Sequence, residues 1–328
     1  MKHLYIIGNG FDIHHKIDSR YSDFKNWLST TESPVLCTID EVFGDIDSDW
    51  WNDFESNLAS VDTLRISIEE ASQHCPDISN DNFRDADWYE AKFAVEQRLE
   101  DAYSEIRKAF QLWVLQLSEG EEDRKIKINV EDSIFMSFNY SETLENLYGI
   151  PNDNILYIHG KAGTNDTLII GHGVSLDELE NRIKVDEPSN NDDNGDSYDY
   201  VVEQAKEAAI IGVHNQRKNI DEIINNNQDW FLTLTDVTHI HIYGHSLADV
   251  DMPYFKKIIS SVKKNDVKFE FSDYRGENKL RIESFIQAEG ISSDNYTIVE
   301  LDSLLINSDC IEVSFCQSCN KKEEPFNV

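Results

Sequence analysis

The sequence predicts an α/β fold with a mainly parallel sheet, helices on both faces of the sheet, and a helical insertion. Two observations lead to this prediction. Short apolar runs of strand length recur along the chain, and helical patterns separate several of them. In addition, glycine, asparagine, histidine or serine follows directly after five of these runs, as expected at the carboxyl ends of buried parallel strands.

The first expected strand, Leu4–Ile7, is a short apolar run that ends in Gly8-Asn9-Gly10, which is typical of a buried strand entering a tight turn. Further strands are expected at Ser133–Phe138, Ile155–Ile158, Leu168–Ile170, Ile240–Tyr243, Val267–Phe271 and Tyr296–Leu301. Helical patterns lie near Glu142–Leu147, Glu203–Ile211, Ile220–Phe231, Met252–Val262 and Lys279–Ala288.

The segment 46–124 differs from the rest because it has long helical patterns and no convincing strand. Its clearest pattern comprises Phe93, Leu99, Tyr103, Ile106, Phe110 and Trp113. We therefore expect an α/β core formed by 1–45 and 125–305, a helical insertion at 46–124, and a polar tail at 306–328. The acidic stretch Asp186–Tyr200 is expected to be a mobile loop within the core.

The composition excludes several classes of protein. The chain has 328 residues with 29 Lys+Arg and 63 Asp+Glu, so its formal charge of −34 disfavours nucleic acid and anionic membranes as partners. Its 40% hydrophobic and 11% aromatic residues argue against disorder. The sequence has no membrane-spanning run and no signal peptide pattern, so we expect a cytoplasmic protein.

Cysteine and histidine spacing gives little support for a metal site. Five scattered cysteines suit a reducing compartment, and Cys316-x-x-Cys319 is only half of a zinc motif. His239 and His241 would face the same side of one strand, where packing is a simpler explanation than metal binding. We therefore expect no metal.

The candidate site residues follow the expected strands. Gly8, Asn9, Gly10 and Asp12 follow the first strand, Asn139 follows Ser133–Phe138, His159 follows Ile155–Ile158, and Gly244 with Ser246 follows Ile240–Tyr243. Gly171-His172-Gly173 forms a fifth such end. Because the carboxyl ends of parallel strands meet at one edge, these residues are expected to converge on a ligand.

Each candidate residue has a chemical role and a structural alternative. Backbone amides of the two glycine turns, Gly8–Gly10 and Gly244–Ser246, could hold a phosphate, or the turns could simply connect elements. Asn139 could hold a ribose hydroxyl or a water, or be a turn residue. His159 could transfer a proton, or bond to a backbone carbonyl in the core. Asp249 could contact a ligand or cap the next helix.

The motifs around these residues resemble the AbiH proteins, a bacteriophage abortive-infection family. The resemblance begins with Tyr5-Ile6-Ile7-Gly8-Asn9-Gly10-Phe11-Asp12 and extends to about residue 305. The later matching motifs, in the same order, are Ser137–Glu145, Ile158-His159-Gly160, Ile170-Gly171-His172-Gly173 and Tyr243-Gly244-His245-Ser246-Leu247. This resemblance implies a bacterial, cytoplasmic antiphage protein.

A more distant resemblance connects the same positions to sirtuin-like domains, which have a Rossmann-like core and bind NAD. In those domains a glycine turn, an asparagine-containing strand end, a His-Gly and a Gly-x-Ser loop form the site. The resemblance implies that Asn139 positions the ribose and the attacking water and that His159 is the base. Protein deacylation is not implied, because no cysteines for a zinc module lie between Cys75 and Cys310.

These resemblances suggest an antiphage protein that hydrolyses NAD⁺ and releases nicotinamide on infection. The positive charge that grows on the ribose would be stabilised by nearby carboxylates such as Asp12. The expected partners are a nucleotide, a phage-derived or host protein as the trigger, and further copies of the chain. A nucleotide-binding sensor without chemistry is the alternative, and a toxin that cleaves nucleic acid is disfavoured by the charge of −34.

Overall fold

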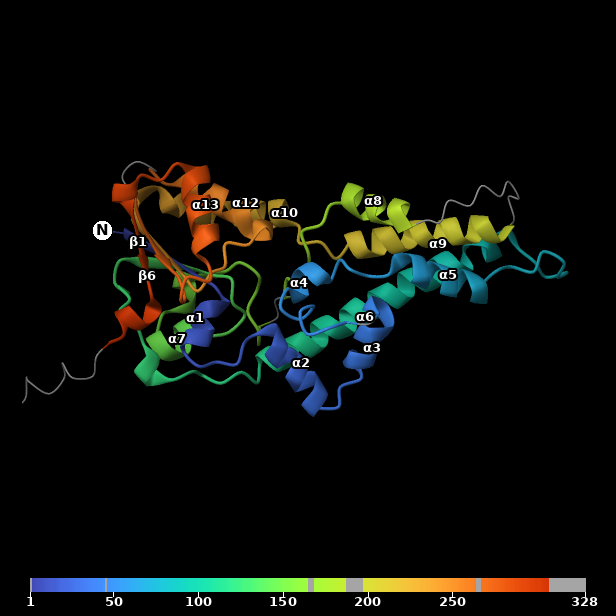
Figure 1. The fold of residues 1–328 in the computed structure, drawn as a ribbon, viewed down its shortest axis with the longest axis horizontal. Coiled ribbons are helices and arrows are strands. Elements are labelled where there is room, and N and C mark those ends of the chain that lie inside the picture. The colour runs from blue at the N-terminus through green and yellow to red at the C-terminus, as the bar shows by residue number, and fades with distance from the viewer. Residues whose placement is uncertain (1, 45, 165–167, 187–196, 264–266, 307–328) are drawn as a thin grey trace, which may run out of the picture.

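The computed structural model describes residues 2–44, 46–164, 168–186, 197–263 and 267–306 (Figure 1). Its centre is a six-stranded sheet in which every pair of neighbouring strands is parallel. The strands are β1 (Lys2–Ile7), β2 (Ser133–Ser137), β3 (Ile155–Tyr157), β4 (Val237–Tyr243), β5 (Lys268–Ser272) and β6 (Tyr296–Val299). The predicted α/β class with a parallel sheet is confirmed.

The strand order is β3-β2-β1-β4-β5-β6, so the chain moves outward from β1 in one direction and later returns to the other side of β1. The order therefore reverses between β1 and β4. In open parallel sheets, the crevice at such a reversal is where ligands bind. The register makes the strand ends level there, because Ile7 pairs with both Ser137 and Tyr243.

Apolar residues on both faces explain the uninterrupted hydrophobic runs of the strands. In β1, Leu4 and Ile6 belong to one buried cluster, and Tyr5 and Ile7 belong to another. The first face packs against α10 (Ile220–Asn226), α11 (Gln228–Leu232), α12 (Met252–Ser261) and α13 (Lys279–Glu289). The second face packs against α1 (Asn9–His14) and α7 (Thr143–Tyr148). Covering both faces is what a parallel sheet requires.

A separate helical part extends from the sheet along the long axis of the molecule (Figure 1). It contains α2 (Tyr21–Thr30), α3 (Val35–Phe43), α4 (Phe54–Asn57), α5 (Thr63–Gln73), α6 (Glu90–Val114), α8 (Leu176–Asp186) and α9 (Ser197–His214). The hydrophobic cluster of this helical part therefore contains residues that precede and follow the segment 46–124 in the sequence, as well as residues of that segment.

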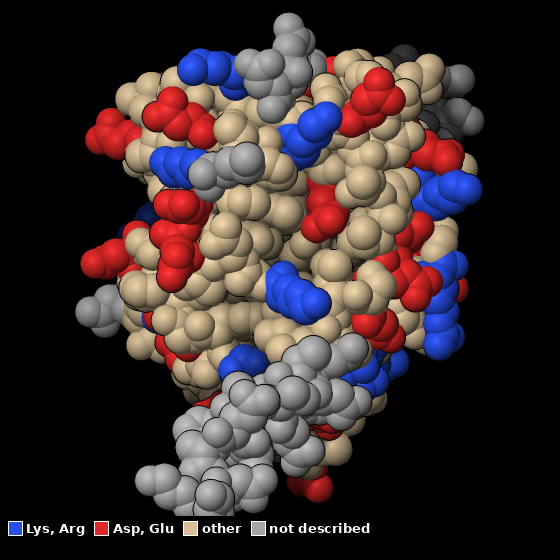
Figure 2. Space-filling model, turned by 90° about the vertical axis from the view of Figure 1, so that its left-hand side faces the viewer, with Lys and Arg blue, Asp and Glu red and all other residues tan. Residues whose placement is uncertain are grey.

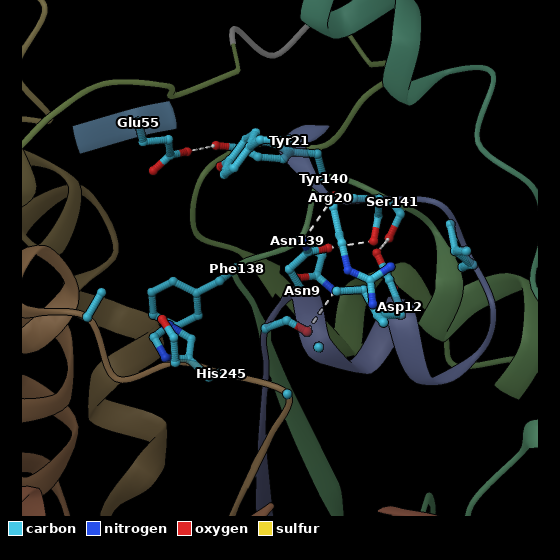
Figure 3. A pocket seen from close by; sticks show the side chains of 18 of the residues that line it. Asn9, Asp12, Arg20, Tyr21, Glu55, Phe138, Asn139, Tyr140, Ser141 and His245 are labelled. Atoms are coloured by element: carbon cyan, nitrogen blue, oxygen red, sulfur yellow. Dashed lines mark hydrogen bonds between the residues drawn. The ribbon is translucent and has the colours of Figure 1, made fainter. Parts of the chain in front are cut away.

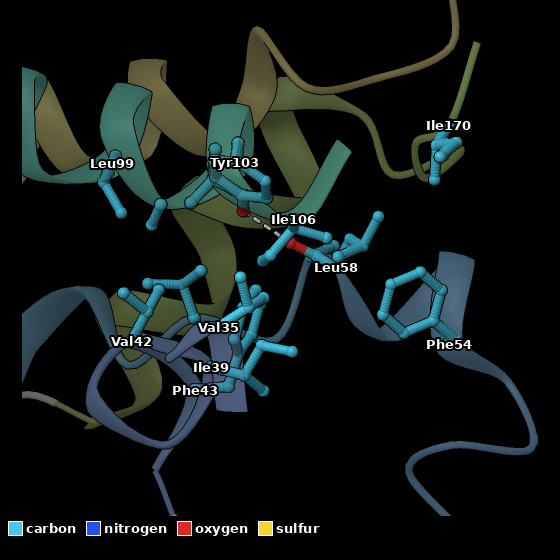
Figure 4. Packing of buried hydrophobic residues seen from close by; sticks show 14 of the residues in the cluster. Val35, Ile39, Val42, Phe43, Phe54, Leu58, Leu99, Tyr103, Ile106 and Ile170 are labelled. Carbon is cyan, nitrogen blue, oxygen red and sulfur yellow. Dashed lines mark hydrogen bonds between the residues drawn. The ribbon is translucent and has the colours of Figure 1, made fainter. Parts of the chain in front are cut away.

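Small residues let α9 approach α6 closely. Ala205, Ala208 and Ala209 of α9 are buried in the helical cluster, and a Cβ on Gly212 would lie 2.8 Å from Leu99 Cδ1 of α6. Tyr103 of α6 fills the space toward α3 and donates its hydroxyl to the Leu58 carbonyl at 2.6 Å (Figure 4). This bond satisfies a buried phenol inside an otherwise apolar cluster.

Two expected elements differ from the structure. The predicted strand at Leu168–Ile170 is wrong, because this segment forms no strand and instead buries Leu168 and Ile170 in the helical cluster. The predicted helix Ile220–Phe231 is divided into α10 and α11 at Asn227, whose side chain donates to the Ile223 carbonyl at 2.8 Å. Asparagine at this position satisfies the end of α10 and interrupts the helix.

The expected loop Asp186–Tyr200 is wrong at its two described ends, because Asp186 is the last residue of α8 and Ser197–Tyr200 form the start of α9. Residues 187–196 of that stretch lie outside the described residues, as do residues 307–328 of the tail, which include Cys310, Cys316 and Cys319. On the face drawn in Figure 2, acidic and basic side chains are interspersed around uncharged surface. Among the described helices, none combines the length and the hydrophobicity needed to cross a membrane.

Candidate functional site

A cleft of about 1190 Å³ lies between the carboxyl edge of the sheet and the helical part (Figure 3). The level ends of the strands bring most of the predicted site residues to its wall. The cleft is lined by Gly8, Asn9, Gly10, Asp12, Asn139, His159, Gly244 and Ser246. Asp249 is exposed and does not belong to the lining, whereas its neighbour Asp251 is buried and does.

The two glycine turns, Gly8–Gly10 and Gly244–Ser246, lie against each other, and this contact requires glycine at three positions. A Cβ on Gly8 would lie 2.6 Å from His245 Cα, and one on Gly10 would lie 2.9 Å from Gly244 Cα. Gly244 has a φ of +66°, and a Cβ there would lie 2.0 Å from the Phe11 nitrogen. The conformation and the close approach both require glycine.

Three of the amides that were expected to hold a phosphate already donate within the protein. The Gly8 N–H donates to the Tyr243 carbonyl at 2.9 Å, and the Gly10 N–H donates to the Gly244 carbonyl at 2.8 Å. The Gly244 N–H donates to Ser272 Oγ at 2.7 Å. Among the described residues, no hydrogen-bond partner is found for the neighbouring backbone N–H groups of Asn9, His245 and Ser246.

Asn139 and Asp12 connect the first two strand ends. Asn139 Nδ2 donates to the Gly8 carbonyl at 3.1 Å, and the Asn139 amide also bonds to the Asp12 carboxylate. Asp12 accepts hydrogen bonds from Ser141 Oγ at 2.5 Å and Thr143 Oγ1 at 2.7 Å. Burial raises the pKa of Asp12, and these hydrogen bonds offset part of the increase. Both side chains therefore also hold the loops in position.

Asn9 and Arg20 stand at the same end of the cleft (Figure 3). The Asn9 side chain is fixed by Ser19, whose backbone carbonyl and hydroxyl bond to it at 2.9 Å and 2.6 Å. The exposed Arg20 forms no ion pair with any residue in the described part of the chain. In a chain with a charge of −34, such an arginine is a notable source of positive charge for an anionic ligand.

His159 is buried among aromatic rings at the floor of the cleft. Its ring lies edge-on to Phe138 at 5.3 Å and near Tyr254 at 5.8 Å between centroids. The ring bonds to the Phe138 backbone, while Nε2 has no hydrogen-bond partner among the described residues. Burial, with the charge of nearby Lys218, holds the pKa of His159 well below its usual range. The imidazole is therefore neutral at physiological pH.

A second histidine, His245, is paired with Asp251. The Leu247 N–H donates to His245 Nδ1 at 2.9 Å, so the ring proton is on Nε2, which faces Asp251 Oδ2 at 3.4 Å. Burial alone would raise the pKa of Asp251, but the His245 hydrogen bond and the charge of Lys218 together lower it to about 2. Asp251 is thus an ionised, buried carboxylate beside His159.

An ion pair that the sequence analysis did not identify joins the helical part to this floor. Lys218 Nζ lies 2.5 Å from Glu55 Oε2 of α4, and the Lys218 side chain is only 1% exposed. Tyr140, directly after Asn139 in the sequence, donates its hydroxyl to Glu55 Oε1 at 2.9 Å (Figure 3). Burial and the charge of Glu55 raise the pKa of Tyr140 well above its usual value, so it remains a donor.

The Gly171-His172-Gly173 motif packs against the backbone next to Lys218 and holds Lys218 in position. A Cβ on Gly171 would lie 2.1 Å from the Gln216 carbonyl oxygen, and the Lys218 N–H donates to the His172 carbonyl at 2.9 Å. The His172 ring bonds to Val213 and to the backbone of Val174, so both of its nitrogens are satisfied. His172 is therefore a structural histidine in the wall of the cleft.

The remaining strand histidines pack against one another. His241 lies 2.9 Å from both His3 and Glu270, and its ring stacks on Tyr5. Within the described residues, no group of histidine, cysteine, aspartate or glutamate side chains is arranged to hold a metal ion.

A family model described as "Bacteriophage abortive infection AbiH" matches residues 4–273, which include every residue of the cleft floor described above. The chain belongs to the AbiH family. This membership connects the AbiH chain with abortive infection, the antiphage role that the motifs suggested. Among curated proteins no match to the chain is found.

Proposed function

We propose that this AbiH chain binds NAD⁺ in the cleft and hydrolyses its N-glycosidic bond when a phage-derived or host protein triggers it in the bacterial cytoplasm. The observation that supports the proposal most strongly is the neutral, buried His159, whose Nε2 is free of partners among the described residues. It lines the same cleft as Asn139 at the reversal of strand order.

The proposed reaction needs a base and an anion, and the cleft floor provides both. A water molecule attacks C1′ of the ribose, and its proton passes to His159 Nε2. The C1′–N bond breaks, and its electron pair stays on nitrogen, so nicotinamide leaves as a neutral molecule. Positive charge grows on the ribose during this step, and the ionised Asp251 stabilises it better than Asp12, whose two hydroxyl donors disperse its charge.

The other end of the cleft suits the pyrophosphate. Arg20 contributes a positive charge that no acidic residue in the described chain neutralises. The N–H groups of Asn9, His245 and Ser246 can add hydrogen bonds. This arrangement replaces the expected amides of Gly8, Gly10 and Gly244, which donate to the protein itself.

Replacing His159 by glutamine tests the proposal. We expect purified wild-type protein, with its trigger where required, to release nicotinamide from NAD⁺. His159→Gln should lower the rate about 10²–10⁴-fold, the usual contribution of a general base, while NAD⁺ binding measured by calorimetry persists. Asp249→Asn is the matched control, because Asp249 is exposed outside the lining, and its rate should equal that of the wild type. Unchanged release by His159→Gln contradicts the assignment of the base.

The pH profile of nicotinamide release gives a second readout from the same assay. A histidine base with its ordinary pKa near 6.5 loses activity as the pH falls through that value. Because burial lowers the pKa of His159, the rate should stay level from pH 8 to below 6.5. A half-maximal rate at about pH 6.5 would show that the base is not this buried residue.

A nucleotide sensor without chemistry is the second candidate, and the engagement of Asn139 favours it. The Asn139 amide bonds to Gly8 and Asp12, so it holds the loops instead of projecting freely toward a ligand. Such a protein binds NAD⁺ or another nucleotide without releasing nicotinamide. Binding without turnover in both wild type and His159→Gln supports the sensor and rejects the hydrolase.

A further inference from the structure

Tyr274 is an exposed aromatic residue in the lining of the cleft, at the turn between β5 and α13. The Glu277 N–H donates to the Tyr274 carbonyl at 3.0 Å, which closes a four-residue turn. The two central residues, Arg275 and Gly276, have φ values of +53° and +82°, as in a type I′ turn. A left-handed φ is costly for arginine, and strained residues of this kind are found preferentially at functional sites.

Hydrogen bonds fix this turn against the loops of the cleft. The buried Asp273 accepts a hydrogen bond from the Asn278 N–H at 2.9 Å. Asn278 Nδ2 in turn donates to the His245 carbonyl at 2.9 Å. The turn that carries Tyr274 is therefore joined to the second glycine turn, which lies against the first. Tyr274 thus has a defined position beside both glycine turns.

The Tyr274 ring offers an open aromatic surface with a cation beside it. Tyr274 is 60% exposed, and the guanidinium carbon of Arg275 lies over its ring, 5.0 Å from the centroid. No other aromatic ring in the described part of the chain contacts it. Tyrosine and arginine are the side chains on which nucleic-acid bases stack, and stacking needs only the face of the base. An exposed cleft rim can therefore bind a base without a buried hydrogen-bonding partner.

The sheet order places Tyr274 away from the proposed base, His159. His159 follows β3 and Tyr274 follows β5, with β2, β1 and β4 between these two strands. The two glycine turns follow β1 and β4, so they lie between His159 and Tyr274 along the carboxyl edge. A dinucleotide has the same order, with a ring at each end and the pyrophosphate between them.

We propose that Tyr274 and Arg275 form the stacking platform for the adenine base of the dinucleotide. The inference rests on the proposed function, which leaves the adenine unassigned, and adds to it the direction of the ligand in the cleft. The nicotinamide end points toward His159, and the adenine end lies on the turn between β5 and α13.

Calorimetric binding of NAD⁺ and ADP-ribose to purified full-length protein tests the platform, because ADP-ribose keeps the adenine end and lacks nicotinamide. Tyr274→Ala should weaken binding of both ligands about 5- to 100-fold, the usual effect of losing one stacked base. Tyr274→Phe keeps the ring and should bind both like the wild type. Leu280→Ala is the matched control, because Leu280 is 80% exposed on α13 outside the cleft lining, and both affinities should stay unchanged.

The two ligands separate failure of this inference from failure of the proposed function. Unchanged affinity of Tyr274→Ala for both ligands overturns the inference even if NAD⁺ is hydrolysed. A loss confined to NAD⁺, or failure of ADP-ribose to bind the wild type when NAD⁺ binds, overturns it as well. Tyr274-dependent binding without nicotinamide release rejects the hydrolase and keeps the platform. If neither ligand binds the wild type, both proposals are rejected.

Discussion

Gly244→Ala is expected to lower the free energy of unfolding by about 2–5 kcal/mol, in two additive parts. The φ of +66° costs a residue with a Cβ about 1–2 kcal/mol. The new Cβ would also lie 2.0 Å from the Phe11 nitrogen and 2.9 Å from Gly10 Cα, and these are backbone atoms that cannot rotate away. Overpacking of this kind adds about 1–3 kcal/mol. Urea denaturation of the wild type and of Gly244→Ala measures the difference in the free energy of unfolding.

Gly149→Ala is the matched control for this change. Gly149 follows α7 with a φ of +63°, but a Cβ there meets no atom within 4 Å. It should therefore show only the conformational cost of about 1–2 kcal/mol. Equal losses in the two variants would mean that the contact between the two glycine loops does not account for Gly244.

Lys218→Met is expected to destabilise the protein by about 3–5 kcal/mol, because it leaves the mostly buried Glu55 without its counter-ion. The Lys218 side chain is 1% exposed and that of Glu55 is 17% exposed, so water screens the pair poorly. Adding Glu55→Gln to Lys218→Met should recover much of the loss, since glutamine removes the remaining charge and can still accept from Tyr140. Denaturation of the single and double variants measures both effects.

Lys279→Met provides the control on an exposed ion pair. The side chains of Lys279 and Glu283 are 62% and 53% exposed and lie 3.9 Å apart on α13. Lys279→Met should therefore change the free energy of unfolding by no more than about 0.5 kcal/mol. If Lys218→Met lowers the free energy of unfolding no more than Lys279→Met does, the claim that a buried ion pair joins the helical part to the cleft floor is contradicted.

The sheet could be predicted from the sequence because its strands are buried on both faces. Continuous apolar runs such as Leu4–Ile7 are then required, and the polar residues that follow them mark the carboxyl edge. Leu168–Ile170 has the same apolar pattern for a different reason, since Leu168 and Ile170 pack in the helical cluster and Ile169 packs against the cluster on one face of the sheet. A three-residue run does not distinguish the two situations.

The cleft floor was only partly predictable, because its charged residues come from distant elements. Glu55 lies on a four-residue helix and Lys218 lies between two helices, and neither position has a local motif. Asp251 has the spacing of a helix-capping residue, and only burial beside His245 distinguishes it from the exposed Asp249. Gly8, Gly10 and Gly244 were expected to offer their amides to a phosphate, but these N–H groups donate within the protein. The contact between the two glycine turns is visible only in three dimensions.

Hydrogen–deuterium exchange with and without NAD⁺ tests most directly the central claim that the cleft is a nucleotide site. We expect NAD⁺ to slow exchange in peptides covering Gly8–Arg20, Phe138–Thr143 and Gly244–Asp251, which come together only at the cleft. Exchange in α5, at the far end of the helical part, should not change (Figure 1). Unaltered exchange in all three segments at saturating NAD⁺, or protection confined to other surfaces, would contradict the account.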